Sequence, residues 1–329
     1  MWLDLSFFTA KAIIIVVLIL CLMAGLLAII VRSKKQTDGT LTIEKLNQHY
    51  THTRKNFFAE IMPKKEFKAF LKDEKLQKKK QEKEKKHNVF VLHFNGDIKA
   101  SAVASLREEI TAIINVATKQ DEVLLQLESH GGTVNGYGLA SAQLMRLREK
   151  SIPLVISIDK IAASGGYMMA CIANKIIAAP FAIIGSIGVI IQLPNFHRLL
   201  KEKQIDFEQH MAGNYKRTIT LFGENTDQGR EKLQEEIEKI HHSFKDLITT
   251  HRPQLDIDQV ATGEHWLGQQ ALALKLVDSI QTSDAYLLER SLSDNLFKIS
   301  FSVKKKSLLK KLADPSAFLR QIVSLFTKN

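Results

Sequence analysis

The stretch "DKIAASGGYMMACIANKIIAAP", residues 159–180, places a serine and two glycines between two apolar runs. "PLVISI" (153–158) predicts a strand before it, a helix is predicted to start near Ser164, and "KIIAA" (175–179) predicts the next strand. A hydroxyl at such a turn, with no bulky neighbour, has two interpretations. Serine and glycine are common turn residues, but an exposed serine oxygen beside open space also suits a nucleophile.

The same alternation of strands and helices continues around this stretch. "VFVLHF" (89–94) and "EVLLQLE" (122–128) predict strands, and apolar residues at helical spacing predict a helix over 101–117 between them. Another helix is predicted over about 136–150. This order favours βαβ units and a mainly parallel sheet. We therefore predict an α/β domain over 88–285, whose functional groups gather where strands end and helices begin.

The N-terminus has a different character. Residues 12–31 form twenty consecutive residues without a charge, which at ~1.5 Å per residue would span a ~30 Å hydrocarbon core. Arg32, Lys34 and Lys35 follow directly, which favours an uncleaved anchor over a signal peptide. We predict a transmembrane helix within residues 1–35.

The charge of the chain is strongly basic. It has 46 Lys and Arg against 35 Asp and Glu, a formal net charge of +11, which indicates an anionic partner such as a membrane surface or a nucleic acid. Residues 64–86 hold eleven lysines and five acids, within a polar, helix-prone stretch at 36–87 that we interpret as a stalk. Neither an aromatic-rich RNA-binding motif nor zinc-finger spacing accompanies them, so we do not predict a nucleic-acid partner. We expect much of the lysine run to form a solvated helix face, which could also lie near anionic lipid headgroups.

The predicted domain is followed by a basic C-terminal tail at 286–329. A strand-like stretch at 297–303 comes first, and apolar residues then recur at helical spacing. This tail fits an interfacial helix, a subunit contact or a helix packed on its own domain. Because the lysines and arginines lie mostly after the predicted anchor, the positive-inside rule favours a cytoplasmic position for everything that follows it.

Two glycine turns follow neighbouring predicted strands. The first, "ESHGGTVNGYG" (128–138), contains Gly131 and Gly132, and the second is "AASGGY" (162–167). Without a Cβ, such residues let backbone amides face a cavity, as in an oxyanion hole, where losing one donor typically costs ~3 kcal/mol of barrier. Either turn alone is ordinary, but the pair indicates a site.

A nucleophilic serine needs a base, and the spacing of residues does not select one. The candidates are His130, His197, His210, His241, His242 and several lysines. A lysine acts as a base only when neutral, so burial must lower its pKa from ~10.4. Lys216, in "MAGNYKRTITLFGEN" (211–225), lies in a segment with few charges nearby apart from Arg217.

Four longer motifs make the pattern specific: "IDKIAASGGYMMA", "APFAIIGSIGV", "AGNYKRTITLFGENT" and "ATGEHWLGQQALALKLVD". Together they resemble the Ser–Lys signal peptide peptidase A family, and most closely its SohB-type branch of inner-membrane proteases. The resemblance covers about residues 88–285. It implies a crotonase/Clp protease-like fold and assembly into homo-oligomeric rings. The chain has no G-x-x-x-x-G-K-[ST] or H-E-x-x-H motif, so neither ATP nor a catalytic metal is expected.

The resemblance assigns roles to individual residues. The family's nucleophile matches Ser164, its general base matches Lys216, and the serine that orients the lysine matches Ser186. The oxyanion positions are Gly131, Gly132 and Gly165. Relatives usually have a proline before the double glycine, where this chain has His130, which loosens the turn and adds a rival base.

The implied activity is that of a serine endopeptidase. Neutral Lys216 would take the proton from Ser164, whose oxygen attacks a peptide carbonyl. The expected substrates are apolar segments, such as spent signal peptides or misfolded envelope proteins. In some rings of the family the lysine reaches the serine of a neighbouring protomer, so self-association is expected. Against the charge bias, the resemblance places the domain on the periplasmic side of the bacterial inner membrane.

Two other functions remain open. The first is a crotonase-like acyl-CoA enzyme, in which the glycine amides polarise a thioester. The second is a membrane scaffold that keeps the fold without activity. The anchor and the "YKRT" segment argue against the former, and the presence of both Ser164 and Lys216 argues against the latter.

Overall fold

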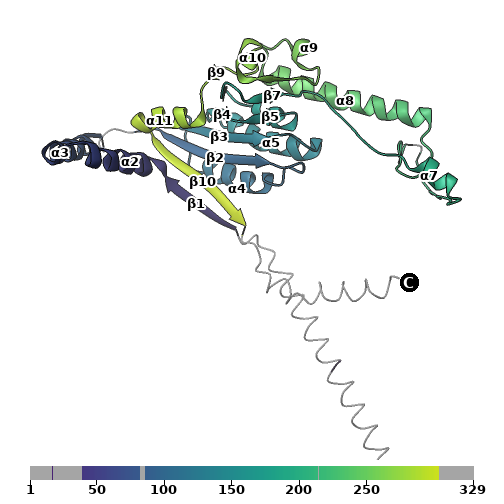
Figure 1. Ribbon diagram of the computed structural model, residues 1–329, viewed down its shortest axis with the longest axis horizontal. Coiled ribbons are helices and arrows are strands. Elements are labelled where there is room, and N and C mark those ends of the chain that lie inside the picture. The colour runs from purple at the N-terminus through teal and green to yellow at the C-terminus, as the bar shows by residue number, and fades with distance from the viewer. Residues whose placement is uncertain (1–16, 18–38, 82–85, 214, 304–329) are drawn as a thin grey trace, which may run out of the picture. The chain divides into compact units, whose positions relative to one another are not determined.

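The computed structural model describes residues 17, 39–81, 86–213 and 215–303 (Figure 1). All but one residue of the predicted anchor at 12–31 lie outside these ranges, as does the tail after residue 303. In the described ranges, no helix is both long and apolar enough to cross a bilayer. The chain divides into residues 41–301 and a second unit formed by its two ends. The first unit carries the candidate site.

A mainly parallel sheet forms the centre of this unit, in the order β1–β10–β2–β3–β4–β6–β9. All neighbours from β10 to β9 run parallel, which confirms the predicted α/β class. The strands are β1 (Gly39–Lys45), β2 (Asn88–Gly96), β3 (Glu122–Ser129), β4 (Leu154–Ile158), β6 (Lys175–Ala178), β9 (Ser279–Ile280) and β10 (Asn295–Val303).

Three short strands branch from the end of β3. β5 (Ile161–Ala163) pairs with β3, and β7 (Ile183–Gly185) pairs with β5, both in parallel. β8 (His265–Leu267) pairs with β7 in the antiparallel direction. Ser164 follows β5 directly, so this branch carries the candidate nucleophile.

The helices follow the sequence pattern closely in the centre of the chain. The predicted helices over 101–117 and 136–150 correspond to α4 and α5. The apolar residues at helical spacing in 227–248 predict a further helix, which corresponds to α8. The helices are α2 (Leu46–Ile61), α3 (Lys64–Gln81), α4 (Val103–Ile114), α5 (Val134–Glu149), α6 (Gly165–Ala170), α7 (His197–Glu202), α8 (Asp227–His251), α9 (Ile257–Val260), α10 (Gly268–Ala273) and α11 (Ser283–Ser293).

Apolar side chains cover both faces of the sheet. In β2, Phe90, Leu92 and Phe94 enter the larger core, whereas Val89 and Val91 enter the smaller one, because successive side chains of a strand point to opposite faces. Helices α4, α5 and α6 contribute to the larger core, and α11 and the start of α2 to the smaller. Covering both faces explains why the strands read as continuous apolar runs.

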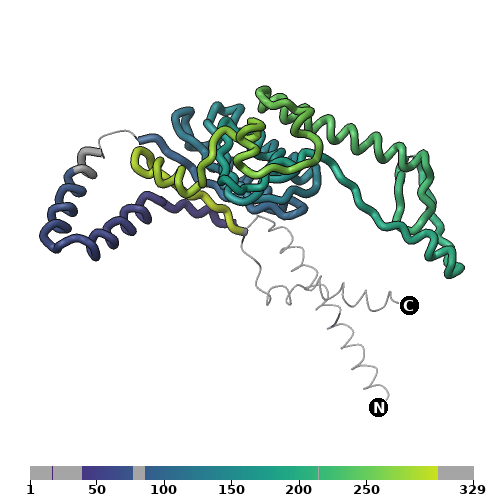
Figure 2. Tube along the Cα trace, turned by 45° about the horizontal axis from the view of Figure 1, so that its top comes forward, coloured from purple at the N-terminus to yellow at the C-terminus, as the bar shows by residue number. Residues whose placement is uncertain are grey.

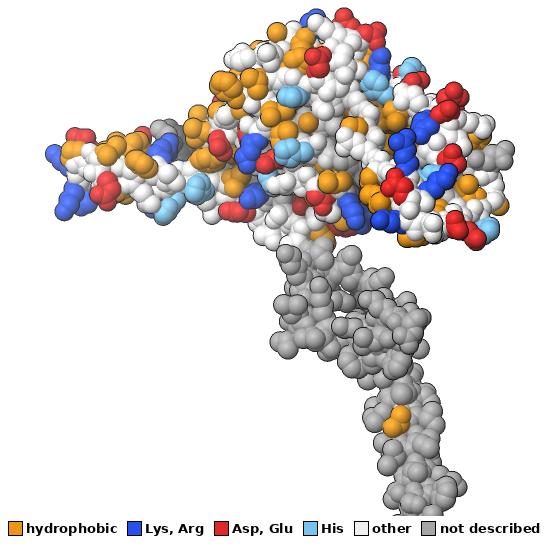
Figure 3. All heavy atoms as spheres, turned by 45° about the vertical axis from the view of Figure 1, so that its right-hand side comes forward, with side chains coloured by type: hydrophobic (Ala, Val, Ile, Leu, Met, Phe, Trp, Pro, Cys, Tyr) orange, Lys and Arg blue, Asp and Glu red, His pale blue; other side chains and the backbone are white. Residues whose placement is uncertain are grey.

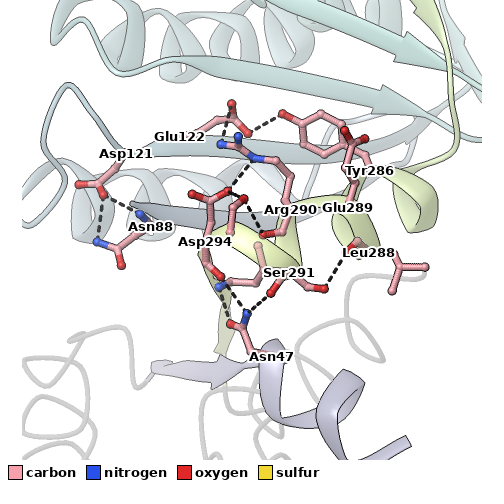
Figure 4. Close-up of polar contacts among 12 residues, drawn as sticks. Asn47, Asn88, Asp121, Glu122, Tyr286, Leu288, Glu289, Arg290, Ser291 and Asp294 are labelled. Atoms are coloured by element: carbon pink, nitrogen blue, oxygen red, sulfur yellow. Dashed lines mark hydrogen bonds and ion pairs between the residues drawn. The ribbon is translucent and has the colours of Figure 1, made fainter. Parts of the chain in front are cut away.

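The predicted stalk at 36–87 contains an edge strand and a helical hairpin. β1 pairs with β10, and α2 follows it directly. Asn47 of α2 donates through Nδ2 to the carbonyl oxygens of Ser291 (3.2 Å) and Asp294 (2.8 Å) (Figure 4). Its Oδ1 accepts from the N–H of Leu296 at 2.7 Å. The first part of the predicted stalk therefore belongs to the folded domain.

The hairpin of α2 and α3 carries a lysine face. Successive helical residues turn by about 100°, so five lysines of α3 lie within an arc of about 100°. They are Lys64, Lys65, Lys68, Lys72 and Lys75. All five are exposed, and none forms an ion pair with another residue in the described ranges. Figure 3 shows blue side chains projecting from the outer end of this hairpin.

Residues 188–226, which we call the arm, leave the sheet between β7 and α8 (Figure 2). The sequence predicts a buried strand and turn over 181–193, and this is correct only for β7. Beyond β7 the side chain of Ile190 is 75% exposed, because the chain has no neighbouring strand there. Within the arm, the Phe222 ring packs against Phe196 and Phe207, at 6.1 and 5.9 Å between centroids.

Candidate active site

Ser164 occupies the sharp turn between β5 and α6. Its φ is +52°, a left-handed conformation that is uncommon for any residue other than glycine. Its N–H donates to the carbonyl of Gly185 at 2.8 Å, and its carbonyl accepts from Met168 at 3.0 Å in the first turn of α6. The side chain is half-buried, and its hydroxyl has no hydrogen-bond partner in the described ranges. The turn thus presents the Oγ atom of Ser164, without a hydrogen bond to the described residues, on a strained backbone.

The two glycines after Ser164 are required by packing. A Cβ on Gly165 would lie 2.4 Å from Cγ of Tyr137, and one on Gly166 would lie 2.8 Å from the carbonyl oxygen of Ser129. Helix α6 therefore approaches α5 and the end of β3 too closely for any side chain. The absence of bulk after the serine is explained by this contact, whether or not a substrate enters.

The first glycine turn touches the second. β3 and β5 pair with Ser129 opposite Ala162, and a Cβ on Gly131 would lie 2.8 Å from Cβ of Ser164. Gly131 has a φ of +88°, which suits glycine. The two turns predicted to form one site therefore meet at the same sheet edge.

The three glycines assigned to the oxyanion hole differ in their amides. The N–H of Gly131 donates to Oγ of Ser129 at 3.0 Å, inside its own turn. The N–H groups of Gly132 and Gly165 have no partner in the described part of the chain. Only the latter two are free to bind a ligand oxygen in this conformation.

Ser186 lies beside Ser164 because of the strand register. β5 and β7 pair with Ala163 opposite Gly185, so the two serines directly follow the ends of adjacent parallel strands, which lie ~4.8 Å apart. Ser186 also has a positive φ, +51°, and its N–H donates to the carbonyl of Glu264 at 2.6 Å.

A small apolar pocket opens beside Ser164. Most of its wall comes from the two glycine turns, α5 and the start of the arm, and Ile240 and Phe244 of α8 close it. Its lining residues are Gly132, Val134, Tyr137, Ser164, Gly165, Met168, Gly188, Val189, Ile240 and Phe244. No charged side chain lines it, so it suits an apolar group.

Lys216 is separated from this pocket within one chain. It is exposed in the arm and does not line the pocket. The ring of its neighbour Tyr215 packs against Lys232 of α8, with Nζ 5.2 Å from the centroid. Lys232 precedes Ile240 by eight residues, about 12 Å along a helix. The structure therefore brings Ser164 and Ser186 together but leaves Lys216 elsewhere.

None of the histidines lines the pocket. His130 is exposed, and Nε2 of His210 lies 3.6 Å from a carboxylate oxygen of Glu208 on the surface. His241 of α8 has a buried Nε2 without a hydrogen-bond partner in the described ranges. Their positions give no histidine a hydrogen bond to Ser164 in this chain.

Sequence reasoning missed two polar residues behind the glycine turns, Ser129 and Tyr137. Their hydroxyl oxygens lie 2.5 Å apart, and both residues are fully buried. The sequence signal that could have identified Tyr137 was its place inside the quoted motif "ESHGGTVNGYG", at an inward-facing position of α5. The only sequence signal for the part of α8 that lines the pocket was the apolar face of a predicted helix, which includes Ile240 and Phe244.

Comparison with known proteins identifies the family. The model described as "Peptidase family S49 N-terminal" matches residues 1–144, and that of "Peptidase family S49" matches residues 146–295. The chain belongs to peptidase family S49. A "Probable protease SohB" of Buchnera aphidicola subsp. Schizaphis graminum is 47% identical over 315 residues, covering 93% of this chain and 92% of that protein. That of Haemophilus influenzae is 56% identical over 230 residues, covering 70% of this chain and 65% of that protein, so less than two thirds of its length.

These matches confirm the resemblance to SohB-type S49 peptidases. A solved structure, of a mutant of the membrane-bound stomatin-specific protease 1510-N, has 16% sequence identity and a TM-score of 0.42. It covers 63% of this chain and 86% of that one. The crotonase/Clp protease-like assignment stays a prediction within the confirmed α/β class.

Proposed function

We propose that this S49 peptidase is a membrane-anchored serine endopeptidase whose nucleophile is Ser164. The observation that carries the proposal is the position of this hydroxyl. This hydroxyl forms no hydrogen bond with the residues that the structure describes, and neither do the nearby amides of Gly132 and Gly165. It lies on a left-handed turn and lines an apolar pocket. A nucleophile, oxyanion donors and a site for a side chain are the parts that acyl transfer needs.

We assign the general base to Lys216 of a neighbouring copy of the chain. Lys216 and its own Ser164 are apart, and the arm that carries Lys216 exposes large apolar side chains. These include Ile190, Leu193, Leu199, Met211 and Tyr215. Docking of the arm against a second copy would bury this surface, and a dry interface favours the uncharged amine that a lysine base requires. Ser186, next to the nucleophile, would then hydrogen-bond the incoming Nζ.

In the proposed reaction each proton has a defined path. The uncharged Nζ of Lys216 accepts the proton of Ser164 as Oγ bonds to the peptide carbonyl carbon. The oxyanion accepts hydrogen bonds from the N–H groups of Gly132 and Gly165. The lysine ammonium returns the proton to the amine as the C–N bond breaks, and water then hydrolyses the acyl-enzyme.

The pocket favours substrates with apolar side chains, such as signal peptide remnants or misfolded envelope proteins. We place the enzyme in the bacterial inner membrane as a homo-oligomeric ring, with its domain in the periplasm. A reporter fused to the C-terminus tests the orientation. We also propose that the lysine face of α3 contacts anionic lipid, where each Lys near the surface adds about 1 kcal/mol. Amine labelling should show these lysines protected in anionic nanodiscs and reactive in zwitterionic ones.

Covalent labelling by a fluorophosphonate tests the chemistry directly. The wild-type chain should be labelled on Ser164, Ser164→Ala should not react, and Lys216→Ala should react far more slowly. An acyl-CoA enzyme of this fold or an inactive scaffold would leave Ser164 unlabelled in the wild type, and that outcome would refute the proposal.

A further inference from the structure

Tyr137 has its hydroxyl in the middle of a buried hydrogen-bond chain. Its side chain is 0% exposed, and its oxygen lies 2.5 Å from Oγ of Ser129 and 2.8 Å from the carbonyl oxygen of Asp97. Oγ of Ser129 in turn lies 3.0 Å from the N of Gly131. The chain thus runs from the loop after β2 to the first glycine turn.

Only one arrangement of protons satisfies every member of this chain. The carbonyl of Asp97 can only accept, so Tyr137 must donate to it. The Tyr137 oxygen is then the acceptor for the hydroxyl of Ser129, and the Ser129 oxygen accepts the N–H of Gly131. Each hydroxyl donates once and accepts once, and the direction is fixed from Gly131 to Asp97.

The tyrosine ring also supports the second glycine turn. A Cβ on Gly165 would lie 2.4 Å from Cγ of Tyr137, and a Cβ on Gly96 would lie 2.4 Å from its hydroxyl oxygen. Tyr137 also lines the pocket. One side chain therefore fixes the turn that carries Gly131 and Gly132 and contacts the turn that carries Ser164 and Gly165.

The polar character of this cluster needs a reason, because buried hydroxyls cost free energy unless they are paired. Phenylalanine and alanine would fill nearly the same space without that cost. Burial raises the pKa of Tyr137, so its hydroxyl keeps its proton and remains a donor at neutral pH. The hydroxyls thus act as a permanent tether for the Gly131 amide.

We propose that Tyr137 and Ser129 are positioning residues, which hold the first glycine turn so that the N–H groups of Gly132 and Gly165 converge on one oxyanion. The inference rests on the proposed peptidase function. Neither residue exchanges a proton with the substrate. They act through Gly131, whose own amide is committed to Ser129 and not to the oxyanion.

The test compares Tyr137→Phe and Ser129→Ala with the wild type in the full chain. We expect kcat to fall about tenfold to hundredfold, less than the 10²–10³ typical when an oxyanion donor is lost, with KM nearly unchanged. The affinity for a peptide aldehyde, whose adduct with the serine forms an oxyanion, should fall in parallel with kcat. The pH dependence of kcat/KM should stay the same, because the base is untouched.

Tyr167→Phe is the matched control. Tyr167 is also 0% exposed, and its hydroxyl donates to a carbonyl oxygen, that of Leu276, at 2.9 Å, rather than to a residue of either glycine turn. Its loss should lower stability but leave kcat and the aldehyde affinity unchanged. If all three variants lose stability while keeping wild-type kcat and aldehyde affinity, the positioning role is wrong.

Hydrogen exchange tests the positioning role independently of the proposed peptidase function. In the wild type, the Gly131 amide should exchange slowly, and Tyr137→Phe and Ser129→Ala should each speed its exchange, whatever the activity of the chain. Unchanged exchange in both folded variants would overturn the inference. An absence of fluorophosphonate labelling in the wild type would overturn the peptidase proposal instead. Should Tyr137→Phe fail to fold, Ser129→Ala decides the question alone.

Discussion

At the scale of single residues, two serines of the site have a strained backbone conformation. Ser164 and Ser186 have φ values of +52° and +51° just after the ends of adjacent strands, and each such conformation costs about 1–3 kcal/mol. Both are held by backbone hydrogen bonds, from Ser164 to Gly185 and from Ser186 to Glu264. The fold therefore supports an unfavourable backbone at the proposed nucleophile and at the serine proposed to orient the lysine.

Replacing Ser164 should separate stability from activity. Ser164→Ala should lower peptidase activity by at least about 10³-fold and leave the free energy of unfolding within about 0.5 kcal/mol. Ser164→Gly should be equally inactive but more stable by about 1 kcal/mol, because glycine tolerates a positive φ. Urea unfolding measures the difference, and equal stability of the two variants would contradict the strain.

The buried carboxyl group of Glu109 in α4 should make the stability of the fold depend on pH. Glu109 is 5% exposed, its Oε1 accepts from the N–H of Phe301 at 2.7 Å, and burial raises its pKa above the ordinary value. The folded state therefore binds the proton more tightly than the unfolded state. Its stabilising contribution is complete below the unfolded pKa and is lost as the pH rises through the folded pKa.

Glu109→Gln should consequently be more stable than the wild type at pH 7. The amide keeps an acceptor for Phe301 without a charge, and each unit by which the pKa is raised is worth about 1.4 kcal/mol. The gap should close as the pH falls to 4, measured by urea unfolding across that range. A gap that widens toward acid would show that the sign is reversed.

At the scale of elements, some helices and strands follow from neighbouring residues in the sequence, whereas others depend on contacts between distant segments. The βαβ alternation around 88–180 was predictable because each strand and helix follows from neighbouring residues. The strand-like stretch at 297–303 corresponds to β10, but its pairing with β1 was not predictable, because it joins segments about 250 residues apart, as does the hydrogen bond between Asn47 of α2 and Leu296. The start of the arm, residues 188–193, was predicted to be buried because it is apolar, but in a single chain Ile190 and Leu193 are exposed.

The same division applies to the site. The motif at 159–180 placed Ser164 on a turn, and the paired glycine turns pointed to one edge. Two features depend on geometry that no local pattern encodes. One is the register that sets Ser186 beside Ser164, and the other is the bond from the Tyr137 hydroxyl to the carbonyl of Asp97, forty residues earlier in the chain.

Asn47 should prove essential for the attachment of α2. Asn47→Ala removes two hydrogen bonds to carbonyls and leaves the N–H of the buried Leu296 unpaired, so we expect a loss of about 2–3 kcal/mol. Asn56→Ala is the control on the same helix, because its exposed Nδ2 contacts only Nδ1 of His52, at 3.3 Å. Thermal unfolding and hydrogen exchange over α2 and β10 give the readout. Equal effects of the two substitutions would argue against this attachment.

At the scale of the whole molecule, the proposed active site is complete only between two copies. Mixing inactive Ser164→Ala chains with inactive Lys216→Ala chains should therefore restore activity. Random assembly of a ring with one repeated interface returns about a quarter of wild-type activity in an equal mixture. The chains should be co-expressed, and each variant expressed alone is the control. Activity that does not return, in assemblies shown to contain both chains, would mean that the lysine serves its own chain.

The close approach of α6, β3 and the loop after β2 has a practical consequence for engineering. A Cβ on Gly132 would lie 2.1 Å from the carbonyl oxygen of Ile98, and one on Gly165 would meet Tyr137, so randomising these positions would yield mostly misfolded libraries. Val134 and Val189 line the pocket without such constraint, and Val134 is 44% exposed. Variants with a changed cleavage preference should be sought at Val134 and Val189, because these side chains can be enlarged or shortened without disturbing the glycine turns around the Ser164 hydroxyl.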